Sequence, residues 1–270
     1  MSAVAGRRLR WALSDGLVLA GRELAHLRHQ PGELVAALVF PAVMVVLFGY
    51  VFGSAIEVPG GGDYREYLMP GLFSMVTLSS LMAVTQKVAA DAEKGVMDRF
   101  RAMPTARSAL AFGHTGADLA GGLLALAIMM GAGAAAGWAP HRGAARAAGA
   151  VALIVLLRYA LSWLGCWLGL AAPSEEVADR LGPLVLPVSM LSNAFVPTDG
   201  MPAWLRVAAE WSPVSALTAA SRTLFGNAGV PAGPAPWPLA HPVLAVCLWS
   251  AVLLAVFVPL TARAYRRRGR

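Results

Sequence analysis

Long apolar runs separated by short polar segments dominate the pattern along this chain. A membrane-spanning helix needs about 20 mostly apolar residues, and six stretches come near that length. They cover residues 34–52, 67–84, 119–138, 147–170, 181–196 and 242–262. The second run is the least apolar, and the fifth is short. The pattern predicts an all-α integral membrane fold with six transmembrane helices within residues 33–262.

Apolar residues also recur ahead of the first run, at steps of three and four. They are Leu9, Leu13, Leu17, Ala20, Leu24 and Leu27, with arginines between them. This spacing predicts that residues 1–32 form an amphipathic helix on the inner membrane surface. A soluble helix packed against a partner would show the same periodicity. Because this segment precedes the first run, we expect a mature chain rather than a cleaved signal peptide.

Composition and charge extend this interpretation. Hydrophobic residues make up 57% of the chain, and the mean hydropathy is +0.61, which excludes an ordinary soluble protein. The net charge of +7 would suggest a nucleic-acid partner in a soluble protein. Here the distribution of basic residues explains it better, and we expect no nucleic acid.

The basic residues gather on one side if the N-terminus is placed inside. The inner segments then hold sixteen of them: Arg7, Arg8, Arg10, Arg22, Arg28, Lys87, Lys94, Arg99, Arg101, Arg107, Arg180, Arg263, Arg266, Arg267, Arg268 and Arg270. The outer segments hold five: Arg65, Arg142, Arg146, Arg206 and Arg222. The positive-inside rule therefore predicts that both termini, including the basic tail 263–270, lie in the cytoplasm. The scarcity of Lys relative to Arg and the abundance of Ala suggest a GC-rich genome, and we expect a bacterial plasma membrane.

Residues 89–108, between the second and third runs, are unusually charged for this chain. The sequence predicts a helix from about residue 84 to 101, which Pro104 then ends or bends. Large apolar side chains, among them Met97 and Phe100, lie between the charges. Such a segment is either a solvated connector or a docking surface for another protein. We favour docking, because a connector needs only a few polar residues.

Small residues recur at four-residue steps within two of the runs. The fourth run has Gly165 and Gly169, and the third has Gly113, Ala117, Gly121 and Ala125, then Gly133 and Gly137. Small residues let helix backbones approach closely in lipid. The spacing therefore predicts a packed helical bundle, without naming the helices that pair.

Three stretches of the chain resemble a known family. "DAEKGVMDRFRAMPTARSALAFGHTGADL" resembles the cytoplasmic signature of type-2 ABC exporter permeases, in particular the daunorubicin-resistance branch. The matching positions are Glu93, Lys94, Gly95, Arg99, Arg101 and Pro104. "PSEEVADRLGPLVLPVSMLSNAFVPTDGMPAWLRVAAEWSPVSAL" resembles the stretch from the end of the fourth span to the outer face, and "PGELVAALVFPAVMVVLFGYVFGSAI" resembles the first span.

The resemblance implies the permease of an ATP-driven exporter, with six spans per subunit and two subunits per complex. Residues 89–108 would be the coupling helix that docks on a separate ABC ATPase, residues 1–32 the connecting helix beside it, and residues 197–225 short re-entrant helices at the outer face. The docking residues would be Asp91, Glu93, Lys94, Gly95, Arg99, Phe100, Arg101 and Pro104. The cargo would be a hydrophobic or amphipathic compound, such as a drug, an antibiotic or a lipid.

The residues themselves argue against ATP hydrolysis by this chain. A P-loop needs a lysine after glycine, yet Lys87 follows Gln86 and Lys94 follows Glu93. We therefore expect no cofactor or catalytic site here, with ATP and Mg²⁺ bound by the partner ATPase. An intramembrane enzyme or a stand-alone secondary transporter are the alternatives. His26 and His29 have a spacing that could bind a metal, but they lack further ligands, and the other histidines belong to different segments. The chain also lacks the two matched halves that are typical of a secondary transporter.

Arg158 is the ionisable residue in the middle of a predicted span. Placing a charge there costs about 2.5 to 3.5 kcal/mol on insertion scales, so some compensation is expected. Arg158 either faces a substrate pathway or pairs with a polar group in the bundle. We assign Asn193 and Phe195 to the same pathway, and we expect Asp118 to stay solvated at the inner interface.

Overall fold

The structure, a computed structural model, describes residues 63–95, 109–196, 198–229 and 235–267, with the single positions 43, 47 and 58. The regular secondary structure in these ranges is entirely helical. The predicted first span at 34–52 and the predicted N-terminal helix at 1–32 lie outside the described residues, apart from positions 43 and 47. So does the part of the charged segment between residues 96 and 108.

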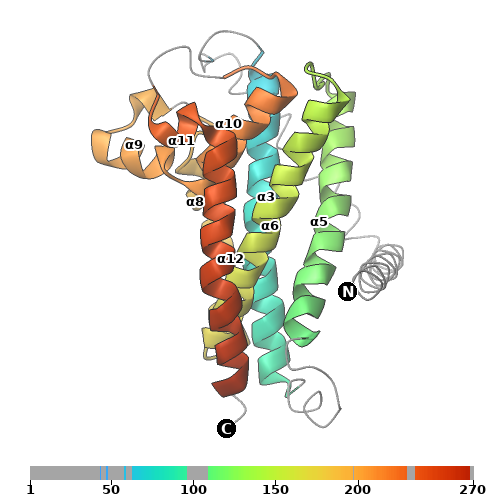
Figure 1. The fold of residues 1–270 in the computed structure, drawn as a ribbon, viewed down its shortest axis with the longest axis vertical. Coiled ribbons are helices and arrows are strands. Elements are labelled where there is room, and N and C mark those ends of the chain that lie inside the picture. Colours follow the sequence, from blue (N-terminus) through green and yellow to red (C-terminus); the bar gives the residue numbers. More distant parts are fainter. Residues whose placement is uncertain are drawn as a thin grey trace, which may run out of the picture.

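Four long helices run side by side and form the bundle (Figure 1). They are α3 (Tyr64–Glu93), α5 (Ala109–Ala135), α6 (Ala144–Ala171) and α12 (Pro242–Arg267). Each is long and apolar enough to cross a membrane. They correspond to the predicted second, third, fourth and sixth spans. We call the two ends of the bundle the Asp63 end and the Glu93 end, after the residues at either end of α3.

The fifth predicted span is not one long helix, and this prediction is wrong. The chain there forms α7 (Glu175–Asp179), η2 (Gly182–Leu184) and α8 (Val185–Met190), followed by turns up to residue 196. Pro183 and Pro187 explain the interruption, since proline has no N–H for the helix ladder and clashes with the preceding turn. These short elements contact α3.

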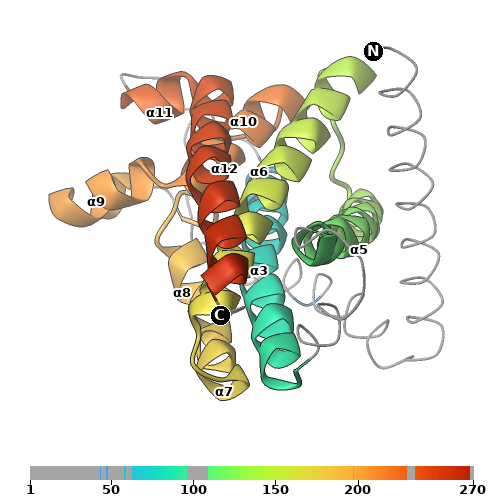
Figure 2. The same ribbon diagram turned by 60° about the horizontal axis from the view of Figure 1, so that its bottom comes forward.

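Short helices follow at the Asp63 end. They are η3 (Thr198–Gly200), α9 (Ala203–Glu210), α10 (Pro213–Phe225) and α11 (Trp237–Ala240). Ser212 caps α10 by accepting from the backbone N of Val214, and Gly226 ends it in the left-handed conformation at φ 80°. Helix α10 is buried against the bundle, whereas α9 projects from it (Figure 2).

The core lies where α6 packs against α3, with α10 closing the Asp63 end. Gly165 and Gly169 of α6 face α3 so closely that a Cβ at Gly169 would lie 2.6 Å from the carbonyl oxygen of Thr85. The predicted close approach is therefore confirmed for the fourth run, and its partner is α3. In the third run, the would-be Cβ atoms of Gly113 and Gly121 meet no atom within 4 Å, whereas that of Gly133 would overlap Cε of Met69, so this stripe approaches α3 at Gly133.

Gly169→Ala is expected to lower the melting temperature in detergent, because the added methyl would also lie 2.7 Å from Cβ of Val88. Overpacking of this kind costs about 1–3 kcal/mol, which exceeds the gain of about 1 kcal/mol in helix propensity. Gly131→Ala is the matched control, since it meets open space on α5. Equal melting temperatures for the two variants would contradict the close approach.

Candidate functional site

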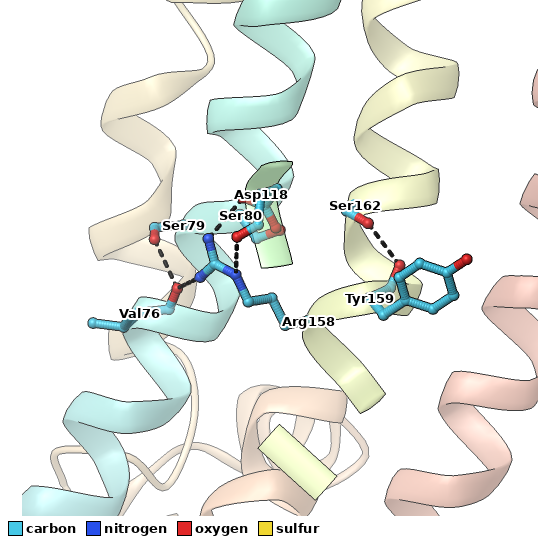
Figure 3. A network of polar contacts seen from close by, with 7 residues as sticks. All are labelled: Val76, Ser79, Ser80, Asp118, Arg158, Tyr159 and Ser162. Carbon is cyan, nitrogen blue, oxygen red and sulfur yellow. Dashed lines mark hydrogen bonds and ion pairs between the residues drawn. The ribbon is translucent and has the colours of Figure 1, made fainter. Parts of the chain in front are cut away.

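Arg158 forms a buried ion pair with Asp118 inside the bundle (Figure 3). Its Nη2 lies 2.6 Å from Oδ1 of Asp118, and its Nη1 donates to the carbonyl oxygen of Val76 at 2.8 Å. Ser80 of α3 donates to the other carboxylate oxygen of Asp118 at 2.6 Å. The network therefore ties α3, α5 and α6 together through one arginine.

Burial of the pair corrects the expectation that Asp118 stays solvated. Asp118 and Arg158 are each 8% exposed. Asp118 tolerates this because an opposite charge and a hydroxyl satisfy its carboxylate. Gly122, one turn further along α5, leaves room for the guanidinium, since a Cβ there would overlap Nε of Arg158. Of the two roles left open for Arg158, the structure shows pairing within the bundle.

A second polar cluster lies at the Asp63 end, around residues 193–195, which we call the clamped turn. The three consecutive carbonyl oxygens each accept from a different side chain. The hydroxyl of Tyr67 donates to Asn193 at 3.0 Å, that of Tyr64 donates to Phe195 at 2.8 Å, and Nη2 of Arg222 donates to Ala194 at 3.1 Å. Side chains of α3 and α10 thus replace the helix bonds that this backbone lacks.

Arg222 is the functional candidate that the sequence reasoning missed. We counted it only among the basic residues of the outer segments, and the structure shows that it is 1% exposed. Its guanidinium carbon lies 3.6 Å from the ring centroid of Tyr67, and Nη2 also donates to the carbonyl oxygen of Tyr67 at 2.9 Å. The available signal was the recurrence of Ser215, Thr218 and Arg222 at steps of three and four, which predicts one polar helix face.

The pathway candidates Asn193 and Phe195 are both buried in this conformation. Phe195 is fully buried within the hydrophobic core, and Asn193 is 8% exposed. The backbone N of Asn193 donates to the hydroxyl of Ser215 at 3.0 Å, which ties the clamped turn to α10 as well. The structure therefore brings Asn193 and Phe195 together but leaves Arg158 in a separate network.

The Glu93 end holds the described part of the charged segment. Helix α3 continues past the predicted second span but ends at Glu93, not near residue 101 as predicted. Lys94 caps it, and Gly95 adopts φ 65°, a left-handed conformation that interrupts the helix. The predicted docking residues Arg99, Phe100, Arg101 and Pro104 lie outside the described residues.

Three of the predicted docking residues contact other parts of this chain. The carboxylate of Glu93 accepts a hydrogen bond from the backbone N of Glu175 at 2.8 Å. Nζ of Lys94 lies 3.6 Å from the carboxylate of Glu175. Asp91 lies 3.3 Å from Nε2 of His114 on α5. The start of the charged segment is therefore held against both α5 and α7.

Within the described ranges, no group of three or more His, Cys, Asp or Glu side chains could hold a metal ion.

The sequence matches the ABC-2 type transporter family over residues 16–225, which is most of the chain. The chain belongs to the ABC-2 type transporter family. It is also 29% identical over 260 residues to the daunorubicin resistance ABC transporter permease protein DrrB1 of Streptomyces coeruleorubidus. That alignment covers 96% of this chain and 88% of the relative.

Family membership confirms the resemblance stated from the sequence. It identifies the chain as the membrane subunit of an ABC exporter, which agrees with four helices that could cross a membrane. Family membership also implies an ABC ATPase partner and dimerisation.

Proposed function

We propose that this chain is the permease of an exporter that moves a hydrophobic or amphipathic compound, such as a drug, an antibiotic or a lipid-like molecule, out of the cell. Two copies of the chain form the translocation unit in the lipid bilayer, and two copies of a separate ATPase bind ATP and Mg²⁺ and drive it. The observation that carries this proposal is the family match over residues 16–225, which includes the charged segment. The daunorubicin-resistance relative supports an apolar or amphipathic cargo.

In this proposal the Glu93 end faces the cytoplasm, with both chain termini on that side. The excess of basic residues in the segments assigned to the inside supports this orientation. Trp204 of α9 and Trp211, which caps that helix, then lie at the opposite surface. They are 75% and 51% exposed, as expected for indoles at headgroup depth.

The ATPase docks on the charged segment through Asp91, Glu93, Lys94 and the residues up to Pro104. Glu93 and Lys94 are bound to Glu175 in the structure, and this supports a rigid attachment of the segment to the bundle. Exposed charge pairs of this kind contribute little stability. Their contribution is geometric: they fix the direction in which the segment leaves α3.

Reconstitution tests the proposed function. The chain, purified with a candidate ATPase encoded beside it, is placed in proteoliposomes, and daunorubicin is used as the probe. We expect ATP-dependent accumulation in inside-out oriented vesicles, and no accumulation when the P-loop lysine of the ATPase is replaced. Uptake driven by an ion gradient without the ATPase would instead support a secondary transporter. ATP hydrolysis by the chain alone would also contradict the proposal.

A further inference from the structure

The clamped turn is non-helical backbone inside a membrane protein, and that restricts where it can lie. Such backbone is tolerated only where it is buried in protein or lines a water-filled cavity. In this structure it is buried, because Tyr64, Tyr67 and Arg222 satisfy its carbonyl oxygens. The remaining permitted state is one in which these carbonyls line an aqueous path. The carbonyl oxygens of the turn can therefore leave their protein partners only where water replaces those hydrogen bonds.

Arg158 and Arg222, the two arginines that are buried among the described residues, are held in different ways. Arg158 has a carboxylate partner in Asp118. Among the described residues, Arg222 has no carboxylate partner, and its charge is balanced by the Tyr67 ring and by the carbonyl oxygens of Tyr67 and Ala194. These groups belong to α3 and to the clamped turn. The charge of Arg222 is thus satisfied inside the protein only while α3, α10 and the turn stay together.

Helix α3 connects this cluster to the opposite end of the bundle. It is one α-helix from Tyr64 to Glu93. A helix of 30 residues is about 45 Å long. A continuous helix can transmit a displacement of the charged segment at Glu93 to Tyr67 and its contacts with Arg222. The seam between α3 on one side and α10 with the clamped turn on the other is where that displacement would separate two packed surfaces.

We propose that Arg222 is the positioning residue that holds this seam closed, and that the seam opens during each transport cycle. The inference rests on the proposed function and assigns a step of it to specific residues. It also accounts for the burial of Asn193 and Phe195: they reach the pathway only when the seam is open.

A reversible cross-link tests whether the seam opens. The hydroxyl of Thr218 on α10 donates to that of Ser74 on α3 at 2.8 Å, so a Ser74→Cys/Thr218→Cys pair is placed across the seam. Cys166 and Cys247 are first replaced by alanine. We expect oxidation to lower transport at least tenfold and a reductant to restore it. The single-cysteine variants, treated in the same way, are the matched controls.

Full transport by the protein with the cysteine pair completely oxidised would contradict the proposal that the seam opens. Failure of the pair to oxidise in the absence of ATP would overturn the closed contact between α3 and α10. If the reduced complex does not transport at all although its ATPase is unaltered, the proposed function fails. The role of Arg222 is then judged by hydrogen exchange alone.

Hydrogen exchange tests the positioning role without any transport. The amides of Asn193 and Ala194 are protected by the hydroxyls of Ser215 and Ser192. We expect Arg222→Gln to speed their exchange at least tenfold, while amides in the middle of α6 stay unchanged. Arg222→Lys keeps a cation over the Tyr67 ring and is expected to restore most of the protection. Unchanged exchange in Arg222→Gln would overturn the assignment.

Discussion

Arg158→Leu is expected to lower the yield of folded protein sharply and to reduce its melting temperature in detergent. The change leaves Asp118 without its ion-pair partner at a position that is 8% exposed. Removing one member of a buried ion pair costs about 3–5 kcal/mol. That is a large share of the roughly 5–15 kcal/mol by which proteins are stable. Size-exclusion chromatography of a fluorescent fusion measures the yield, and a thermal ramp measures the stability.

A double variant separates this stability effect from a role in transport. In Asp118→Leu/Arg158→Leu no charge is left unpaired, and replacing a buried pair by apolar residues is often neutral. Ser80 can then donate to the carbonyl oxygen of Val76, four residues earlier on α3, as serine does in helices. We expect this variant to recover the wild-type yield.

Transport by the double variant decides what Arg158 does. Wild-type transport would show that the pair serves only to join α3, α5 and α6. Loss of transport at normal yield would place Arg158 in the substrate pathway, as the sequence alone suggested. A wild-type yield for Arg158→Leu itself would contradict the energetic role of the ion pair.

For Arg158, the sequence predicted the position in a helix but not the partner. The apolar run placed the arginine in the middle of a helix, and the insertion cost predicted some compensation. The partner could not be identified, because Asp118 is 40 residues away on another helix and the hydrophobic pattern does not set the register between helices. The same limit applies to Arg222 and Tyr67, which meet across 155 residues.

The prediction of a spanning helix over the fifth run, residues 181–196, failed for a different reason. The mean hydropathy of a run stays high when Leu, Val and Met are abundant, whether or not prolines interrupt the helix. Pro183 and Pro187 were visible in the sequence and predict an interruption. The helix predicted over 84–101 is interrupted at Gly95 for a similar reason, since glycine is the residue most able to adopt the left-handed conformation that follows α3. In both places local backbone chemistry outweighed the pattern.

Glu93→Lys is expected to abolish coupling between ATP hydrolysis and transport, with at least a tenfold loss of ATP-dependent uptake, while the protein remains in the membrane. The change removes the carboxylate that accepts from the backbone N of Glu175. It also sets a second cation beside Lys94, which competes for the single carboxylate of Glu175. The charged segment then leaves α3 in a different direction. Uptake by proteoliposomes and co-purification of the ATPase measure the two effects.

Glu93→Gln is the matched control, because its amide oxygen still accepts from Glu175 while the negative charge is lost. Normal uptake in Glu93→Gln, beside loss in Glu93→Lys, would assign Glu93 to holding the segment within this chain. Loss of uptake and of the co-purified ATPase in both variants would assign the carboxylate to direct docking on the ATPase. Normal transport and a normal ATPase yield in Glu93→Lys would contradict both roles, since the variant disrupts the in-chain hydrogen bond and reverses the charge presented to a partner.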